Sequence, residues 1–111
     1  MENPTMTFYN PSLIVGDKSK TYVATHEISH SWTGNDVTCG DWANLWLNEG
    51  FTTFEERKVS GKLFGEDFML AEYYNGNISL VVTVSMLGEY NDYTSLHPDL
   101  YGEFPDSYVT Q

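Results

Sequence analysis

Two histidines, His26 and His30, stand four positions apart in the sequence HEISH, and Glu49 follows after a further eighteen residues. On a helix, side chains at this spacing lie one turn apart on one face, so both imidazoles can reach one metal ion. Two imidazoles and one carboxylate leave the fourth tetrahedral position of zinc to water, as in catalytic sites. The spacing therefore predicts one Zn²⁺ per chain, with His26, His30 and Glu49 as ligands.

Glu27 lies about 100° around the same helix from His26. Its carboxylate is therefore expected beside the metal-binding face, where it can hold a water molecule and act as the general base. The alternative is a chance occurrence of the motif. A metzincin site is excluded, because the pattern HExxHxxGxxH requires Gly and His at the positions where this chain has Thr33 and Asp36.

A further acid, Glu56, follows Glu49 by seven residues, which is two turns along the same helix face. We expect Glu56 to accept a hydrogen bond from the free ring nitrogen of a ligand histidine and so to fix its tautomer. The alternative is that Glu56 pairs with Arg57 or Lys58 or faces water. Asn48 is a candidate for a similar supporting part.

The composition limits the classes of fold and partner. The chain has 111 residues, 41% of them apolar and 15% aromatic, which allows one domain at most with a core. The formal net charge of −11 argues against a nucleic-acid partner, because binding to phosphates requires a basic surface. An acidic cleft instead favours substrates with a cationic amino terminus.

Cys39 is the single cysteine, so the chain cannot form an internal disulfide. This indicates a reducing compartment, and we expect the protein to be cytoplasmic. The sequence contains no run of eighteen apolar residues, so we expect no membrane span. The pattern of a signal peptide is also missing from it.

The first half of the chain predicts the element that carries the histidines. Polar and apolar residues alternate over residues 5–9, which predicts a short N-terminal strand that ends at Pro11. Asp17 follows a glycine and is expected to be the N-cap of a helix that runs to about Trp32.

The second half predicts two more helices and a loop. One helix is expected from the N-cap Asp41 to Gly61, and another over residues 65–88, weakened near Gly76, although residues 81–84 favour a strand by propensity. Residues 88–111 predict a loop, in which His97 is not expected to bind metal. Three apolar side chains on the face that carries Glu49 are more typical of a core than of a substrate-binding surface: Trp42, Leu45 and Trp46.

Several motifs carry a resemblance to a known family. The segments MENP (1–4), HEISHSWTGN (26–35) and WLNEG (46–50) resemble the gluzincin zinc aminopeptidases of the membrane alanyl aminopeptidase superfamily. Within this family, HEISHSWTGN together with GDKS (16–19) and LFGEDF (63–68) is most similar to the leukotriene A-4 hydrolase and aminopeptidase B branch. The resemblance implies a mainly α, thermolysin-like catalytic domain with a short N-terminal strand. It also implies that residues 1–111 are a partial zinc metallopeptidase catalytic domain, truncated at both ends.

The resemblance implies hydrolysis of the N-terminal peptide bond of peptides with a free amino terminus. In that family the glutamate of the MEN segment, here Glu2, grips the α-amino group of the substrate, and a carboxylate facing an ammonium forms a charge-assisted hydrogen bond. Without the resemblance, Glu2 is an ordinary exposed acid. In related enzymes a further carboxylate near the cleft helps to hold the substrate, and Asp106 is a candidate for this part. The resemblance also favours a helix over residues 81–84.

The family also uses a tyrosine in a PYEKG-like segment to donate a hydrogen bond to the oxyanion. PYEKG does not occur here, and the nearest candidate, Tyr108, has no matching flanks. We expect the tyrosine beyond Gln111. Because the loss of such a donor typically costs a hundredfold or more in rate, residues 1–111 alone are expected to be a poor enzyme.

Two other functions remain open at this point. The leukotriene branch implies opening of a lipid epoxide at the same zinc. A noncatalytic, zinc-stabilised interaction module is the alternative from another class of protein. Glu27 argues against the module, because a structural zinc site closes its fourth position and needs no base.

Overall fold

The computed structural model describes residues 1–108, apart from the side chain of Asp106, so the predicted place of this carboxylate lies outside the described residues. Over these residues the protein is mainly helical. Its α-helices are α1 (Thr21–Ser29), α2 (Trp46–Phe64) and α3 (Glu66–Leu87). Short 3-10 helices complete the fold: η1 (Pro11–Leu13), η2 (Trp42–Asn44), η3 (Asp92–Thr94) and η4 (Pro105–Tyr108).

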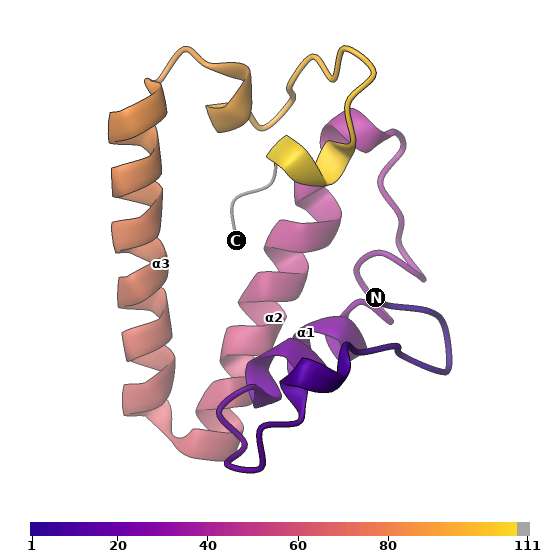
Figure 1. Cartoon of the computed structure of the whole chain (residues 1–111), viewed down its shortest axis with the longest axis vertical. Helices are drawn as coiled ribbons and strands as arrows, with labels where there is room; N and C mark the ends of the chain where they lie inside the picture. The colour runs from indigo at the N-terminus through magenta and orange to yellow at the C-terminus, as the bar shows by residue number, and fades with distance from the viewer. Residues whose placement is uncertain (109–111) are drawn as a thin grey trace.

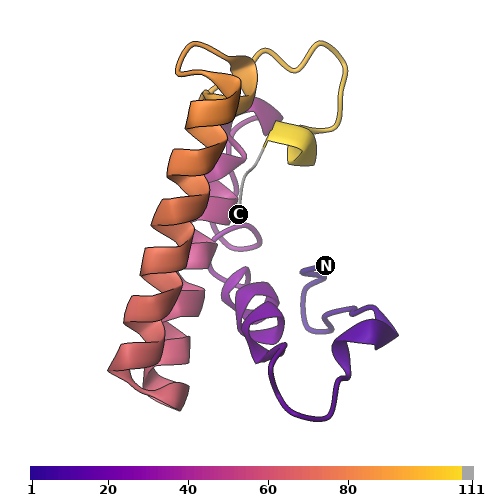
Figure 2. The same ribbon diagram turned by 60° about the vertical axis from the view of Figure 1, so that its left-hand side comes forward.

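The helix α2 lies at the centre of the arrangement. It packs against α1 and forms an antiparallel hairpin with α3 (Figure 1). Figure 2 shows the N-terminal segment beside α1 and away from α3. None of the helices in residues 1–108 is both long enough and apolar enough to span a lipid bilayer.

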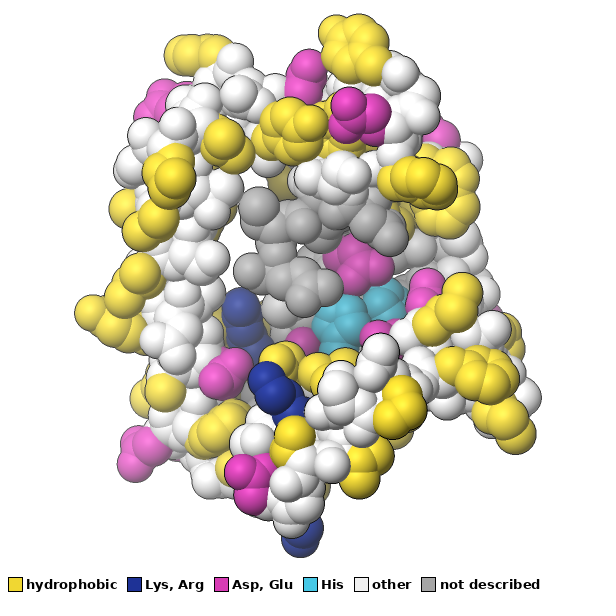
Figure 3. All heavy atoms as spheres, viewed as in Figure 1, with side chains coloured by type: hydrophobic (Ala, Val, Ile, Leu, Met, Phe, Trp, Pro, Cys, Tyr) yellow, Lys and Arg dark blue, Asp and Glu magenta, His cyan; other side chains and the backbone are white. Residues whose placement is uncertain are grey.

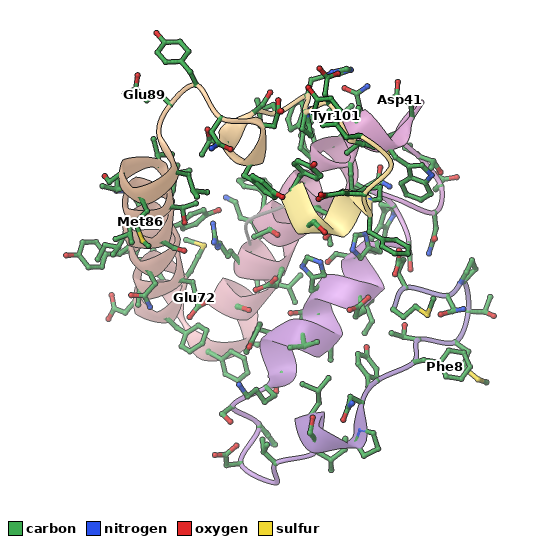
Figure 4. The ribbon with its side chains drawn as sticks, turned by 45° about the horizontal axis from the view of Figure 1, so that its top comes forward. Phe8, Asp41, Glu72, Met86, Glu89 and Tyr101 are labelled. Atoms are coloured by element: carbon green, nitrogen blue, oxygen red, sulfur yellow. The ribbon has the colours of Figure 1, made fainter. Side chains whose placement is uncertain are left out.

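The predicted N-terminal strand is wrong: no strand occurs among the described residues, and the one isolated bridge joins Thr33 and Val37. The start of the chain turns back on itself instead. The backbone N–H of Phe8 donates to the carbonyl of Met1 at 3.2 Å, and Thr5 has a positive φ of 68°. A strand needs a neighbouring strand for its backbone groups, and here the segment bonds within itself. The side chain of Phe8 points outward (Figure 4).

The helix α1 is shorter than the expected one. Asp17 does not cap it, because its carboxylate accepts the backbone N–H of Ser19 at 2.9 Å in a local turn. The chain leaves this turn through Lys18 with a positive φ of 65°, and α1 begins only at Thr21. At its other end α1 stops at Ser29, before the expected end at Trp32.

Asp41 is an N-cap, but of the 3-10 helix η2 and not of α2, which begins only at Trp46 with Leu45 at its N-cap. The carboxylate of Asp41 accepts the N–H of Asn44 at 3.2 Å, and Figure 4 shows it where the chain enters η2. The predicted end at Gly61 is wrong, because α2 continues to Phe64 and turns at Gly65, whose φ is 103°. Gly61 serves packing between helices. A Cβ atom there would lie 3.1 Å from the side chain of Met69 on α3.

The helix α3 is unbroken, which corrects the weakening predicted near Gly76. Gly76 lets α3 approach α2 closely, because the guanidinium of Arg57 occupies the space that a Cβ atom would need. Arg57 also lies over the ring of Tyr73, 5.3 Å from its centroid. Residues 81–84 are helical, so the helical context outweighs their strand propensity.

Burial in this protein is concentrated where α1 meets α2, and it is mostly polar. Among the described residues, Leu45 and Tyr108 are the buried hydrophobic side chains. Because polar groups are normally left in water, a polar interior at a helix contact indicates a functional site. The buried polar residues are Thr25, His26, Ser29, His30, Asn48, Thr52, Glu56 and Ser60.

Candidate metal centre

Both predicted histidine ligands come from α1 and the residue that follows it. His26 lies in the last turn of α1, and His30 is the residue that caps its end. Glu49 lies in the first turn of α2, which crosses α1. Both histidines are buried. Figure 3 shows histidine side chains near the middle of this face, with acidic side chains beside them.

The structure brings one atom from each of these three side chains to a common point. The two Nε2 atoms of His26 and His30 are 3.1 Å apart. Oε2 of Glu49 lies 3.2 Å from Nε2 of His26, and its Oε1 lies 3.5 Å from Nε2 of His30. Ligands bound tetrahedrally to zinc at about 2.0–2.1 Å lie roughly 3.3 Å from one another. The measured separations, in which Glu49 takes part through both of its carboxylate oxygens, are close to this value, so the three side chains could hold a zinc ion.

The hydrogen bonds of the two Nδ1 atoms determine which nitrogen of each imidazole can bind a cation. Nδ1 of His26 lies 3.0 Å from Oε2 of Glu56, and Nδ1 of His30 lies 2.8 Å from the carbonyl oxygen of Thr33. Since both oxygens accept hydrogen bonds, each Nδ1 carries the proton. In the neutral rings both Nε2 lone pairs then point toward each other and toward the carboxylate of Glu49. The donor set fits Zn²⁺, which binds neutral imidazole and carboxylate.

The electrostatics of the metal-free site agree with this chemistry. Burial lowers the pKa of His26, but the hydrogen bonds to Glu49 and Glu56 outweigh it and raise the pKa to about 9. Burial raises the pKa of Glu49, but the hydrogen bonds from His26 and His30 outweigh it and lower the pKa to about 2. Without a metal ion, the site therefore holds a proton between the carboxylate and the imidazoles.

Zinc binding is expected to depend on pH for this reason. At pH 7 His26 is protonated in the metal-free protein, because its pKa is about 9, and zinc must displace that proton. Burial lowers the pKa of His30 too, but the hydrogen bond to Glu49 outweighs it and raises the pKa. The apparent zinc affinity should therefore rise at least tenfold per pH unit below about pH 9 and level off above that. Titration calorimetry in two buffers of different ionisation enthalpy should show release of at least one proton per zinc at pH 7. Release of none would contradict this electrostatic account.

Glu27 follows His26 on α1, and neither Glu27 nor Glu2 is part of the cluster of three. The carboxylate of Glu27 accepts from the amino group of Met1 at 2.9 Å, and 16% of its side chain is exposed. Glu2 is held through its backbone, because the side-chain amide of Asn35 donates to its carbonyl oxygen at 2.7 Å. The MENP segment is thus attached directly to the HEISHSWTGN segment.

Two supporting residues were not predicted from the sequence. The carbonyl of Thr33 holds His30, and a backbone group leaves no signal in the residue type. Thr52 contacts the same ring and could have been found, since it lies one turn after Glu49 on the same face of α2. Asn48 was suggested as a residue that supports a ligand in the way that Glu56 does. Its side chain instead accepts a hydrogen bond from the backbone N–H of Cys39 at 3.0 Å.

Gly34 is also required by the geometry of the site. Its φ is 131°, a conformation that residues with a side chain rarely adopt. A Cβ atom at this position would lie 2.9 Å from Nδ1 of His30. A side chain here would therefore displace the ring of His30 as well as strain the backbone.

A cavity of about 480 Å³ opens beside Glu49, between α2, α3 and the segment from η3 to η4. Apolar and aromatic side chains line much of it, including Trp42, Trp46 and Leu80. Of the three residues expected in the core, Leu45 is buried, whereas Trp42 is 62% exposed and faces this cavity. His97 is exposed and lies outside the metal cluster.

The chain is similar to known enzymes over almost its whole length. A model of the peptidase family M1 domain matches residues 1–108. Leukotriene A-4 hydrolase of Xenopus laevis is 46% identical over 101 residues, which are 91% of this chain and 17% of that protein. Leucine aminopeptidase 2 of Phaeosphaeria nodorum is 43% identical over 106 residues, which are 96% of this chain and 17% of that protein. The chain thus spans about a sixth of the length of these relatives. It belongs to peptidase family M1.

Proposed function

We propose that this chain forms the metal centre of a zinc aminopeptidase that hydrolyses the N-terminal peptide bond of peptides. The observation that carries the proposal is that His26, His30 and Glu49 converge on one point. The Nδ1 atom of each imidazole is hydrogen-bonded to an acceptor on the side away from that point. Zinc bound there supplies Lewis-acid polarisation of a water molecule and of the scissile carbonyl group. Membership of family M1 and the similarity to a leucine aminopeptidase support the choice of peptide substrates.

Glu27 is the general base in this proposal. It is the neighbour of His26 on α1, so its carboxylate lies beside the ligand face of the helix. As the water oxygen attacks the carbonyl carbon, the carboxylate accepts the proton of the water. It then delivers the proton to the nitrogen of the leaving amine as the C–N bond breaks.

Glu2 sets the register of the substrate in the same proposal. Its carboxylate binds the α-ammonium group of the first residue, which limits cleavage to the N-terminal bond. The hydrogen bond from Asn35 to its backbone supports this role, because it ties Glu2 to the segment that carries the ligands. The net charge of −11 also favours a cationic group.

The activity is tested with the protein expressed from its complete gene. We expect hydrolysis of amino-acyl arylamides and no hydrolysis of the same compounds with an acetylated amino group. Removal of zinc with a chelator should abolish turnover, and added zinc should restore it. Equal cleavage of free and acetylated substrates would contradict the role of Glu2. Turnover that persists without zinc would contradict the metal centre.

Opening of a lipid epoxide at the same centre is a second candidate. The 46% identity to a protein named leukotriene A-4 hydrolase and the apolar walls of the 480 Å³ cavity beside Glu49 favour it. Incubation with an unsaturated fatty-acid epoxide, compared with the arylamides, separates the two activities. A third possibility, a noncatalytic zinc-stabilised interaction module, predicts a bound zinc that a competitive aminopeptidase inhibitor does not affect.

A further inference from the structure

One face of α2 supplies a partner to each of the imidazoles in the site. Glu49, Thr52 and Glu56 follow one another at helical spacing, so their side chains lie in one stripe toward α1. Glu49 faces both Nε2 atoms, and Glu56 faces Nδ1 of His26. The residue between them, Thr52, has no role in the proposed reaction and is completely buried.

The hydroxyl of Thr52 both donates and accepts hydrogen bonds beside His30. It donates to the carbonyl oxygen of Thr33 at 2.9 Å, the same oxygen that accepts from Nδ1 of His30. Its Oγ1 also lies 3.1 Å from that Nδ1 and within hydrogen-bond distance of the hydroxyl of Thr33. The N–H of the ring is therefore shared between two acceptors, one from the loop after α1 and one from α2.

We propose that Thr52 is a positioning residue for His30, an inference that rests on the proposed zinc site. By fixing the carbonyl of Thr33 and the Nδ1–H together, its hydroxyl sets the tautomer and the orientation of the imidazole. Because Thr52 lies one turn after Glu49 on the same helix, it also fixes His30 relative to the carboxylate ligand. The hydroxyl of Thr52 therefore fixes the position of His30 relative to Glu49.

The same stripe of α2 contains a matched control. Ser60 lies eight residues after Thr52, and its side chain is also buried, at 1% exposure. Its hydroxyl has no hydrogen-bond partner among the described residues. Removal of either hydroxyl takes a buried polar atom from the same face of α2, but only that of Thr52 touches a ligand.

The test uses zinc-loaded protein expressed from its complete gene. The zinc dissociation constant is measured by competition with a chelator for the wild type, Thr52→Val, Thr52→Ser and Ser60→Ala. Outer partners of metal ligands typically contribute 10- to 100-fold to affinity. Because His30 keeps the carbonyl of Thr33, we expect Thr52→Val to weaken zinc binding by about tenfold. Thr52→Ser should stay near the wild type, and Ser60→Ala should not change the affinity.

A second readout follows the ring itself. In protein labelled with ¹⁵N-histidine, exchange of the Nδ1–H of His30 with solvent should be faster in Thr52→Val than in Thr52→Ser. Circular dichroism confirms that each variant is folded, and Thr52→Ala replaces Thr52→Val if the latter is not.

The outcomes separate this inference from the proposed function. A wild type that does not bind zinc would overturn the zinc site and the positioning role together. If the wild type binds zinc, but a folded Thr52→Val or Thr52→Ala variant has unchanged affinity and unchanged exchange, the positioning role alone is wrong. Equal losses in Thr52→Ser and Thr52→Val would also contradict it, since the hydroxyl is present in one of them.

Discussion

Replacement of Glu27 by glutamine is expected to leave one zinc bound per chain and to lower aminopeptidase kcat by about 10²–10⁴-fold. General acid–base catalysis contributes a factor of this size, and glutamine cannot accept the proton of the attacking water. Zinc should stay because Glu27 does not belong to the cluster of His26, His30 and Glu49. The measurements are metal analysis and steady-state kinetics on an amino-acyl arylamide.

The control for this prediction is Glu66→Gln, the same chemical change at an exposed glutamate in the first turn of α3. It should have wild-type kcat and zinc content. Turnover by Glu27→Gln at the level of this control would end the assignment of Glu27 as the base. Loss of zinc from Glu27→Gln would show that the residue acts on the metal rather than on the water.

The second large effect is expected from Glu49→Ala, which removes one of three protein ligands. Its carboxylate lies within 3.5 Å of both Nε2 atoms, so its loss leaves two imidazoles to hold the ion. We expect zinc affinity to fall by more than the 10- to 100-fold that is typical when a residue hydrogen-bonded to a metal ligand is replaced. Chelator competition measures the difference.

The comparison variant is Glu56→Gln. Glu56 lies on the same face of α2 as Glu49, but its carboxylate contacts Nδ1 of His26 and not the two Nε2 atoms. It should lose about 10- to 100-fold in zinc affinity. The order expected is therefore a larger loss for Glu49→Ala than for Glu56→Gln. Equal losses in the two variants would mean that Glu49 is not a ligand.

The positions of the chemistry-bearing side chains were predictable because helical periodicity is a local property. The spacing of His26 and His30 needs only one turn of helix, and the step from Glu49 to Glu56 needs two. In the structure, the ligand atoms of the cluster lie within 4.8 Å of one another. Glu56 lies 3.0 Å from Nδ1 of His26.

Some errors of the sequence analysis come from contacts between segments far apart in the chain, and others come from local turns such as the one in which Asp17 accepts the N–H of Ser19. Gly61 was expected to end a helix, but its role is close packing with Met69 of the next helix. The alternation over residues 5–9 predicted a strand, but no second strand is present in the described residues to pair with it. Thr33 acts through its carbonyl group, which every residue type has. The residue types alone do not indicate these contacts.

The most direct test of the metal centre is zinc K-edge X-ray absorption on the zinc-loaded protein expressed from its complete gene. The structure predicts a shell of nitrogen and oxygen neighbours at about 2.0–2.1 Å that includes two imidazole rings. Cys39, the single cysteine of the chain, should not contribute. A sulfur neighbour at about 2.3 Å, or a spectrum without imidazole scattering, would contradict the site formed by His26, His30 and Glu49.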